Sequence, residues 1–223
     1  MESTVSTGSN SLAGYGRSPA AAHPSVSCLS KRAIDILGSL VGLLILAVVW
    51  VPIAIAIKVD SAGPIFYSQE RYGLHGKPFR IWKFRSMVSN ADELKKLVKN
   101  EVQGHLFKNE NDPRITRVGR FLRRTSLDEF PQFWNVLQGD MSLVGTRPPT
   151  ADEVAQYETH HWQRLNVKPG ITGQWQVSGR SAIKDFEEVV KLDLCYQERW
   201  SPLYDLQLIL QTVLNILSRS DAY

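Results

Sequence analysis

The chain has 223 residues, of which 43% are hydrophobic and 22% charged, so it is long and apolar enough to bury a core, which argues against wholesale disorder. Its 26 Lys and Arg residues outnumber its 22 Asp and Glu residues, and the net charge of +4 suits a phosphate-bearing ligand or an anionic membrane surface. The two cysteines form no Cys-x-x-Cys motif and indicate reduced thiols, and no basic stripe with interleaved aromatic residues is long enough to indicate nucleic-acid binding.

Residues 1–30 consist largely of Ser, Ala, Gly and Pro, and Glu2 and Arg17 are their only formal charges. Such a composition lacks the apolar side chains that a packed core requires. We therefore expect a disordered tail that ends at Lys31 and Arg32.

Residues 36–57 contain no charged side chain and are long enough for a membrane helix, which needs roughly 20 apolar residues. A cleaved signal peptide is disfavoured because more than 30 residues precede the apolar run. A spanning helix and a re-entrant helix both remain open, since basic residues flank the run on both sides and the positive-inside rule does not separate the two. Pro52 predicts a bend, because proline removes one helical hydrogen bond.

The region after the apolar run reads as a mixed soluble domain. Residues 64–73 and 77–87 predict short strands or extended segments, with turns at Gly73 and Gly76. We expect helices over 89–104, 184–199 and 202–217. The last of these is strongly apolar, which favours core packing, with binding to a membrane interface as the alternative.

Five arginines crowd residues 114–124, and three of them, Arg117, Arg120 and Arg124, share one face at helical spacing. Such a face is either simply solvated or, beside a membrane segment, in contact with lipid phosphate. The sequence leaves both interpretations open.

Several common catalytic signatures are missing. GLHGK at 73–77 has too few residues between its glycines for a phosphate loop, and the chain has no Asp-x-Asp, Gly-x-Ser-x-Gly, His-Glu-x-x-His or Gly-x-Gly-x-x-Gly motif. The adjacent histidines His160 and His161 are expected to point to different sides of any regular element, which argues against a zinc site.

The stretch SLDEFPQFWN, residues 126–135, admits two interpretations. Ser126 and Glu129 have the spacing of a capping box at a helix start, and Asp128 would then only complement the helix dipole. Pro131 disagrees with that reading, because it would fall inside the helix. We therefore expect that the helix begins later or that its first turn is irregular, and an irregular turn that carries two carboxylates suits catalysis. Nearby arginines could then bracket a phosphate chain: Arg123, Arg124 and Arg147.

From Lys31 to its end, the chain resembles the bacterial sugar transferase family, the monotopic polyprenyl-phosphate phosphoglycosyl transferases. The resemblance rests on ordered motifs: KRAID at 31–35, IFYSQERYG at 65–73, KPFRIWKFRSM at 77–87, RRTSLDEFPQFWNVLQGDMSLVGTRP at 123–148, KPGITGQWQVSGR at 168–180 and YQERWSPLYDLQLILQT at 196–212. Chance does not explain so many blocks in one order.

The resemblance implies a specific reaction. Asp128 would attack the β-phosphate of a UDP-sugar and expel UMP, and undecaprenyl phosphate would then take the sugar-1-phosphate from the carboxylate. Glu129 would assist, Asp128 would also hold part of an Mg²⁺ site, and four cations would bind the phosphates: Lys83, Arg85, Arg123 and Arg147. The sugar is expected to be a hexose, with glucose and galactose as the first candidates.

The resemblance also implies an architecture. We expect an α-rich α/β fold, with a re-entrant membrane helix over 31–58, kinked at Pro52, and a catalytic domain over 59–223. The tail and the domain would lie on the cytoplasmic face of the bacterial inner membrane, against membrane lipid. The sequence leaves open whether the chain forms a homodimer, and a catalytically inactive membrane-bound scaffold is the alternative function.

Two positions depart from the family's pattern. Val51 stands where a serine commonly precedes the membrane proline, so a hydroxyl that would bond the freed carbonyl is absent. Thr146 stands where a proline commonly precedes Arg147, and we expect a less rigid loop there.

Overall fold

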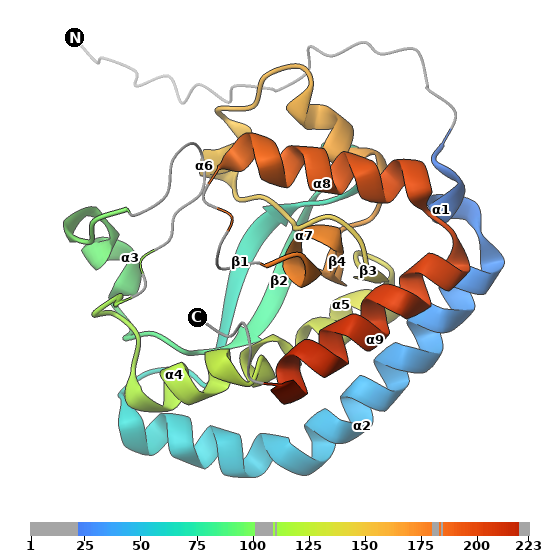
Figure 1. The fold of residues 1–223 in the computed structure, drawn as a ribbon. Helices are drawn as coiled ribbons and strands as arrows, with labels where there is room; N and C mark the ends of the chain where they lie inside the picture. The colour runs from blue at the N-terminus through green and yellow to red at the C-terminus, as the bar shows by residue number, and fades with distance from the viewer. Residues whose placement is uncertain (1–21, 101–108, 110, 180–182, 184, 219–223) are drawn as a thin grey trace, which may run out of the picture.

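The computed structural model describes residues 22–100, 109, 111–179, 183 and 185–218. This part of the chain forms a helix-rich body with two small two-stranded sheets and one long N-terminal helix that runs along its side (Figure 1). The expected α-rich fold with a short sheet is confirmed at this level.

The ordered structure begins earlier than the expected boundary at residue 30. A short helix α1, Pro24–Ser27, and the first turn of α2 already lie within the segment expected to be disordered. His23 explains why, because its Nε2 lies 2.9 Å from the carbonyl oxygen of Gln197 in α8. Residues 1–21 of the expected tail lie outside the described residues.

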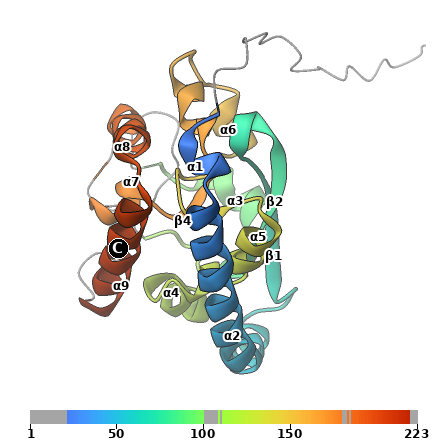
Figure 2. The same cartoon turned by 90° about the vertical axis from the view of Figure 1, so that its right-hand side faces the viewer.

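Helix α2, Leu29–Asp60, contains the whole apolar run and continues through Pro52. Its ribbon changes direction along its length in both views (Figures 1 and 2). The helix is long and apolar enough to cross a membrane by length and composition. Its exposed face carries a continuous set of large apolar side chains, which a water-facing surface does not favour: Leu37, Leu40, Val41, Leu44, Ile45, Val48, Trp50, Val51, Ile55 and Val59.

The two expected strands form an antiparallel hairpin of β1, Phe66–Tyr72, and β2, Pro78–Phe84, and both strand predictions are confirmed. A 3₁₀ turn, η1 (Leu74–Gly76), joins them. The register pairs Arg71 with Phe79 and Tyr67 with Lys83. Because paired residues in an antiparallel ladder point to the same face, Arg71 and Lys83 lie on one face of the hairpin.

The helix expected over 89–104 is shorter in the structure. A single turn α3, Ala91–Leu94, is followed by a 3₁₀ turn η2, Lys95–Leu97, and the backbone becomes extended at Val98. Residues 101–108 lie outside the described part of the chain. The prediction of one long helix over this segment is therefore wrong up to residue 100.

The arginine-rich segment forms helix α4, Arg117–Arg124, and Thr116 caps it by accepting a hydrogen bond from the backbone N–H of Gly119 at 3.0 Å. Arg117, Arg120 and Arg124 are exposed on α4, whereas Arg114 precedes the helix and is buried against Asp112 at 2.7 Å. The five arginines are thus divided between an exposed face and buried polar contacts.

The rest of the chain builds the centre of the domain. Strands β3, Ser142–Val144, and β4, Gly170–Thr172, pair in parallel. The remaining elements have these bounds: η3 Leu127–Glu129, α5 Gln132–Gln138, α6 Ala151–Val154, η4 His161–Asn166, α7 Gln174–Val177, α8 Phe186–Arg199 and α9 Pro202–Ser218. The two predicted C-terminal helices are confirmed as α8 and α9. Around β3, apolar side chains from β2, α5, α8 and α9 form the main core.

Buried polar contacts attach the start of α2 to this core. Lys31, only 4% exposed, places its Nζ 2.6 Å from Oδ2 of Asp205 in α9 and 3.0 Å from the carbonyl oxygen of Val144. Arg32 donates to the last carbonyl groups of α5, at Val136 (2.8 Å) and Leu137 (2.7 Å). The basic pair before the apolar run is therefore bound to protein groups.

The other end of α2 is attached to the same body. Arg85, which follows β2, donates to the carbonyl oxygens of Ser61 at 2.7 Å and Ala62 at 2.6 Å. Asp60 accepts the backbone N–H of Val118 in α4 at 2.9 Å. Both ends of the apolar helix are thus held by one folded unit.

Candidate active site

Asp128 and Glu129 lie in the 3₁₀ turn η3, between helices α4 and α5. Ser126 adopts a left-handed conformation, with φ of 55°, and its side chain makes no capping hydrogen bond. Helix α5 begins only at Gln132, after Pro131 as its N-cap. The capping-box interpretation of this stretch is therefore wrong, and the expected irregular turn and late helix start are both confirmed.

The two carboxylates occupy different environments. Asp128 is only 6% exposed. Glu129 is half-buried, and its Oε1 accepts a hydrogen bond from Nζ of Lys83 at 2.7 Å. Because Lys83 lies on β2, this ion pair joins the hairpin to the turn that carries the dyad, and the structure brings three of the sequence-predicted site residues together.

Arg123 lies one turn before the dyad, at the end of α4. Its Nε donates to the hydroxyl of Ser86 at 2.9 Å. Helix α4 packs very closely on this segment, since a Cβ added at Gly119 would come within 2.0 Å of the carbonyl oxygen of Ser86. Within the described residues, the two terminal nitrogens of Arg123 make no hydrogen bond, so they can bind an anion.

Arg85 has a different set of partners. Its guanidinium binds the carbonyl oxygens at the end of α2 and the hydroxyl groups of Ser61 (3.0 Å) and Ser89 (3.2 Å). These contacts satisfy carbonyl groups that a helix end leaves without partners. They give Arg85 a role in holding α2, and they offer no support for contact with a substrate phosphate.

Arg147 is likewise bound by another side chain of the protein. Its guanidinium forms a two-pronged ion pair with Glu153, at 2.9 to 3.1 Å. Burial lowers the pKa of Arg147, but the charge of Glu153 and its hydrogen bonds outweigh burial and raise it. Burial likewise raises the pKa of Glu153, and the charge of Arg147 outweighs it, so the carboxyl pKa lies below its ordinary value. The pair is therefore charged on both sides.

The loop around Arg147 is better anchored than its departure from the family pattern suggested. The hydroxyl of Thr146 donates to the carbonyl oxygen of Arg164 at 3.1 Å, and its own carbonyl accepts the N–H of Gly170 at 2.9 Å. A capping box of Thr150 and Glu153 starts α6 directly after it. The expectation of a less rigid loop receives no support from these contacts.

Sequence reasoning missed one cation near the dyad, Arg71 of β1. The charges of Arg147, Glu153 and Glu129 all act on its guanidinium. The available signal was the period of two in the hairpin, which places Arg71 on the face of Lys83 once the register is known. The register itself depends on the turn at 74–76 and could not be read from the motif alone.

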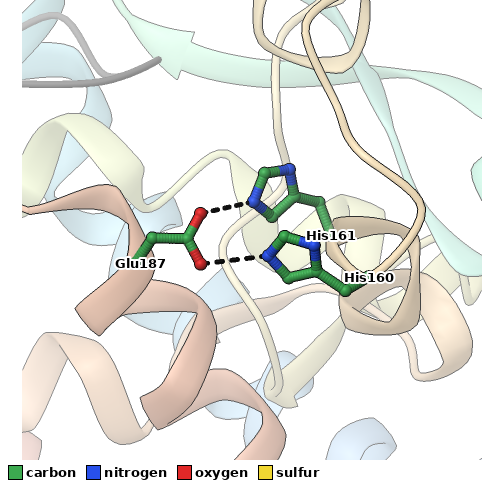
Figure 3. A group of neighbouring side chains, drawn as sticks. All are labelled: His160, His161 and Glu187. Carbon is green, nitrogen blue, oxygen red and sulfur yellow. Dashed lines mark hydrogen bonds and ion pairs between the residues drawn. The ribbon is translucent and has the colours of Figure 1, made fainter.

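His160, His161 and Glu187 form a separate cluster between η4 and α8 (Figure 3). Nε2 of His160 lies 3.0 Å from one carboxylate oxygen of Glu187, and Nε2 of His161 lies 2.6 Å from the other. The expectation that the two histidines point to different sides is wrong. The two histidines lie at the start of the 3₁₀ helix η4, where each ring reaches one oxygen of the Glu187 carboxylate. The centroids of the two imidazole rings are 3.9 Å apart.

This cluster has the composition of a metal site, since its ligand atoms all lie within 4.8 Å of one another. The hydrogen bonds favour a different interpretation. Nδ1 of His161 accepts the backbone N–H of Glu158 at 2.9 Å, so the ring proton of the neutral form resides on Nε2 and is donated to Glu187. A metal-bound histidine normally donates from its other nitrogen. The cluster is therefore best described as a hydrogen-bonded contact that joins η4 to α8.

A model of the bacterial sugar transferase family matches residues 26–219. The chain belongs to this family. Among curated members, it is 51% identical over 191 residues to a galactosyl transferase of Streptococcus agalactiae serotype III, and 42% identical over 205 residues to a UDP-glucose:undecaprenyl-phosphate glucose-1-phosphate transferase of Escherichia coli K12. These alignments cover 85% and 89% of the chain but only 42% of either relative.

This family member thus spans about two-fifths of the length of those curated relatives. It is also 38% identical to an uncharacterised sugar transferase of Bacillus subtilis, and this alignment covers similar shares of both proteins, 84% of the chain and 87% of the relative. The residues that the family model matches contain both α2 and the dyad turn.

Proposed function

We propose that this protein transfers a sugar-1-phosphate from a UDP-sugar to undecaprenyl phosphate, releasing UMP. The product is an undecaprenyl-diphosphate sugar, the first membrane-bound intermediate of a polysaccharide or glycoconjugate. The names of its relatives support the substrate classes, since they include a galactose phosphotransferase and a glucose-1-phosphate transferase that act on undecaprenyl phosphate. The observation that carries the proposal is the Asp128–Glu129 dyad in an irregular turn, with Lys83 bound to Glu129.

In the proposed first step, a carboxylate oxygen of Asp128 forms a bond to the β-phosphorus of the UDP-sugar. The bond from that phosphorus to the oxygen bridging the two phosphates breaks, and UMP leaves with the electron pair. In the second step, an oxygen of undecaprenyl phosphate attacks the same phosphorus and displaces Asp128. Covalent catalysis of this kind lets two bulky substrates use one site in turn.

The surrounding charges suit phosphoryl transfer, in which positioning and charge neutralisation supply most of the catalysis. Lys83 binds Glu129, and Arg123, at the end of the helix before the dyad turn, has terminal nitrogens without a hydrogen-bond partner among the described residues. Carboxylate oxygens are the ligands that Mg²⁺ prefers, so Asp128 would hold the ion together with substrate phosphates, whose charge the ion neutralises. Arg85 and Arg147 contribute by holding α2 and the loop before α6.

Measuring the released nucleotide tests this function. The purified protein, with undecaprenyl phosphate and Mg²⁺, is expected to release UMP from a panel of UDP-sugars, with UDP-glucose and UDP-galactose as the first candidates. UMP marks cleavage between the two phosphates, whereas UDP would mark sugar transfer without phosphate. Release of UDP would contradict the proposal, and release of neither from any donor would favour a catalytically inactive scaffold.

We further propose that α2 is re-entrant, so that both of its ends lie on the cytoplasmic face of the bacterial inner membrane, where UDP-sugars are made. Lys31 at one end and Asp60 at the other contact the same folded unit. A helix that crossed the bilayer could not keep both contacts, since one end would be separated from that unit by the hydrocarbon core of about 30 Å. The exposed apolar face of α2 would then contact lipid.

Cysteine labelling tests this topology. With the two native thiols replaced, Cys28→Ser and Cys195→Ser, single cysteines at Ser30→Cys and Ala62→Cys flank the apolar run at exposed positions. A membrane-impermeant maleimide is expected to leave both unlabelled in intact spheroplasts and to label both in inverted vesicles. Labelling of the two positions from opposite sides would require a spanning helix instead.

A further inference from the structure

Arg71 combines placement beside the dyad with incomplete pairing. It lies near the end of β1, on the hairpin face that also carries Lys83. Lys83 binds Glu129 directly, and the charge of Glu129 also acts on the Arg71 guanidinium. Arg71 therefore lies on the side of the hairpin that faces the dyad.

The hydrogen bonds of Arg71 go to neutral groups only. One terminal nitrogen donates to the carbonyl oxygen of Pro148 at 3.0 Å, and the other donates to Oε1 of Gln69 at 2.7 Å. Its Nε is buried and has no hydrogen-bond partner among the described residues. A buried N–H donor without an acceptor is costly, and among the described residues the Nε of Arg85 is the other arginine Nε in this state.

The charge of Arg71 is not neutralised either. Within the described part of the chain it forms no ion pair, because the nearby carboxylates are engaged: Glu153 by Arg147, and Glu129 by Lys83. Burial and, after it, the charge of Arg147 lower the pKa of Arg71 to about 10. The guanidinium thus remains protonated at neutral pH, as a half-buried cation without an ion pair among the described residues.

We infer that Arg71 binds a phosphate group of the substrate, through the donor that the protein leaves unpaired. The inference rests on the proposed function for the identity of that substrate. A guanidinium matches the planar spacing of two phosphate oxygens, and a dianionic or diphosphate group would also supply the missing negative charge. Arg71 then performs the phosphate contact that sequence patterns attributed to Arg147, whose guanidinium is already bound to Glu153.

The competing explanation is that Arg71 only holds the loop at Pro148. Both explanations predict some loss of stability when Arg71 is replaced, but only phosphate binding predicts a loss of ligand affinity. A measurement of binding without turnover therefore separates them.

Titration of the 223-residue protein with UDP in detergent tests the inference. The variants are Arg71→Gln, Arg71→Lys and the matched control Arg80→Gln, whose side chain is exposed on the opposite face of the same hairpin. We expect Arg71→Gln to weaken UDP binding about 10- to 100-fold, Arg71→Lys to weaken it less because the charge remains, and Arg80→Gln to leave it unchanged. Apparent KM values for the UDP-sugar and for undecaprenyl phosphate show which substrate carries the phosphate.

An Arg71→Gln protein with a lowered melting temperature but with UDP affinity and both KM values within about twofold of wild type would overturn the inference. An unchanged UDP affinity with a raised KM for undecaprenyl phosphate would support it and attribute the phosphate to the lipid. If Arg71→Gln does not fold, Arg71→Lys decides: a severalfold loss of affinity supports the inference, and no loss overturns it. If wild type releases no UMP but Arg71→Gln still loses UDP affinity, the proposed function fails while phosphate binding stands.

Discussion

Replacing Asp128 with asparagine is expected to abolish formation of a sugar-phosphate adduct on the protein and to reduce UMP release by about 10³-fold or more. The neutral amide is a poor nucleophile and a poorer metal ligand, so neither the first bond nor the charge balance of the site survives. Because Asp128 is only 6% exposed and asparagine has nearly the same shape, the fold is expected to persist. A UDP-sugar labelled with ³²P in its β-phosphate and separated by gel measures the adduct directly.

A matched control for this experiment is Asp92→Asn. Asp92 is an exposed aspartate in the short helix α3 and forms no part of the dyad turn. The Asp92→Asn protein should form the adduct at the wild-type rate. A labelled adduct that persists in Asp128→Asn would show that another group is the nucleophile, and loss of the adduct in both variants would show that the effect is not specific to the dyad.

Replacing Lys31 with methionine is expected to lower the free energy of unfolding by about 3–5 kcal/mol, the usual consequence of removing one partner from a buried ion pair. Lys31 and Asp205 are 4% and 1% exposed, and their charged atoms lie 2.6 Å apart. Without Lys31, the carboxylate keeps only neutral donors, Tyr196 at 2.9 Å and Trp200 at 3.1 Å. Chemical unfolding of the protein in detergent measures the change.

Lys58→Met provides the control, because Lys58 is a lysine of the same helix α2 but is exposed. It is expected to change the free energy of unfolding by less than about 0.5 kcal/mol. The double variant Lys31→Met with Asp205→Leu should recover much of the loss, since an apolar pair can replace a buried ion pair. A Lys31→Met protein as stable as Lys58→Met would show that the contact does not attach α2 to the domain.

The elements that sequence patterns predicted well are those whose signal is local. The apolar period of 184–199 and 202–217 predicted α8 and α9, and residues 64–73 and 77–87 were predicted as short strands or extended segments, which form the hairpin. In these segments the type of element follows from the local pattern. The core packing expected for 202–217 is wrong for most of its apolar side chains, which are exposed on α9: Leu203, Leu206, Leu210, Val213, Leu214 and Leu217. The segment 89–104 was predicted as a solvent-facing helix, yet only short turns formed before residue 100, since propensity alone does not hold a helix that packs little.

The shape of the dyad turn could be predicted from neighbouring residues, but its contacts with the rest of the domain could not. Pro131 cannot donate the hydrogen bond that a helix started at Ser126 would need, so its presence alone predicted the irregular turn. The identity of the two carboxylates, and the family motif that contains them, also belong to the sequence. The ion pair of Glu129 with Lys83, by contrast, joins residues 46 positions apart and depends on how the hairpin packs.

The sequence by itself determined the apolar helix, the family, the dyad and the irregularity of its turn, because each follows from neighbouring residues or from ordered motifs. Only the tertiary structure decided which basic residues face the dyad. Arg85 binds the end of α2 and Arg147 binds Glu153, while Arg71 lies on the hairpin face of Lys83 and hydrogen-bonds neutral groups only. The physical reason is that a guanidinium binds whichever acceptors the fold brings to it, and those acceptors come from segments distant in the chain.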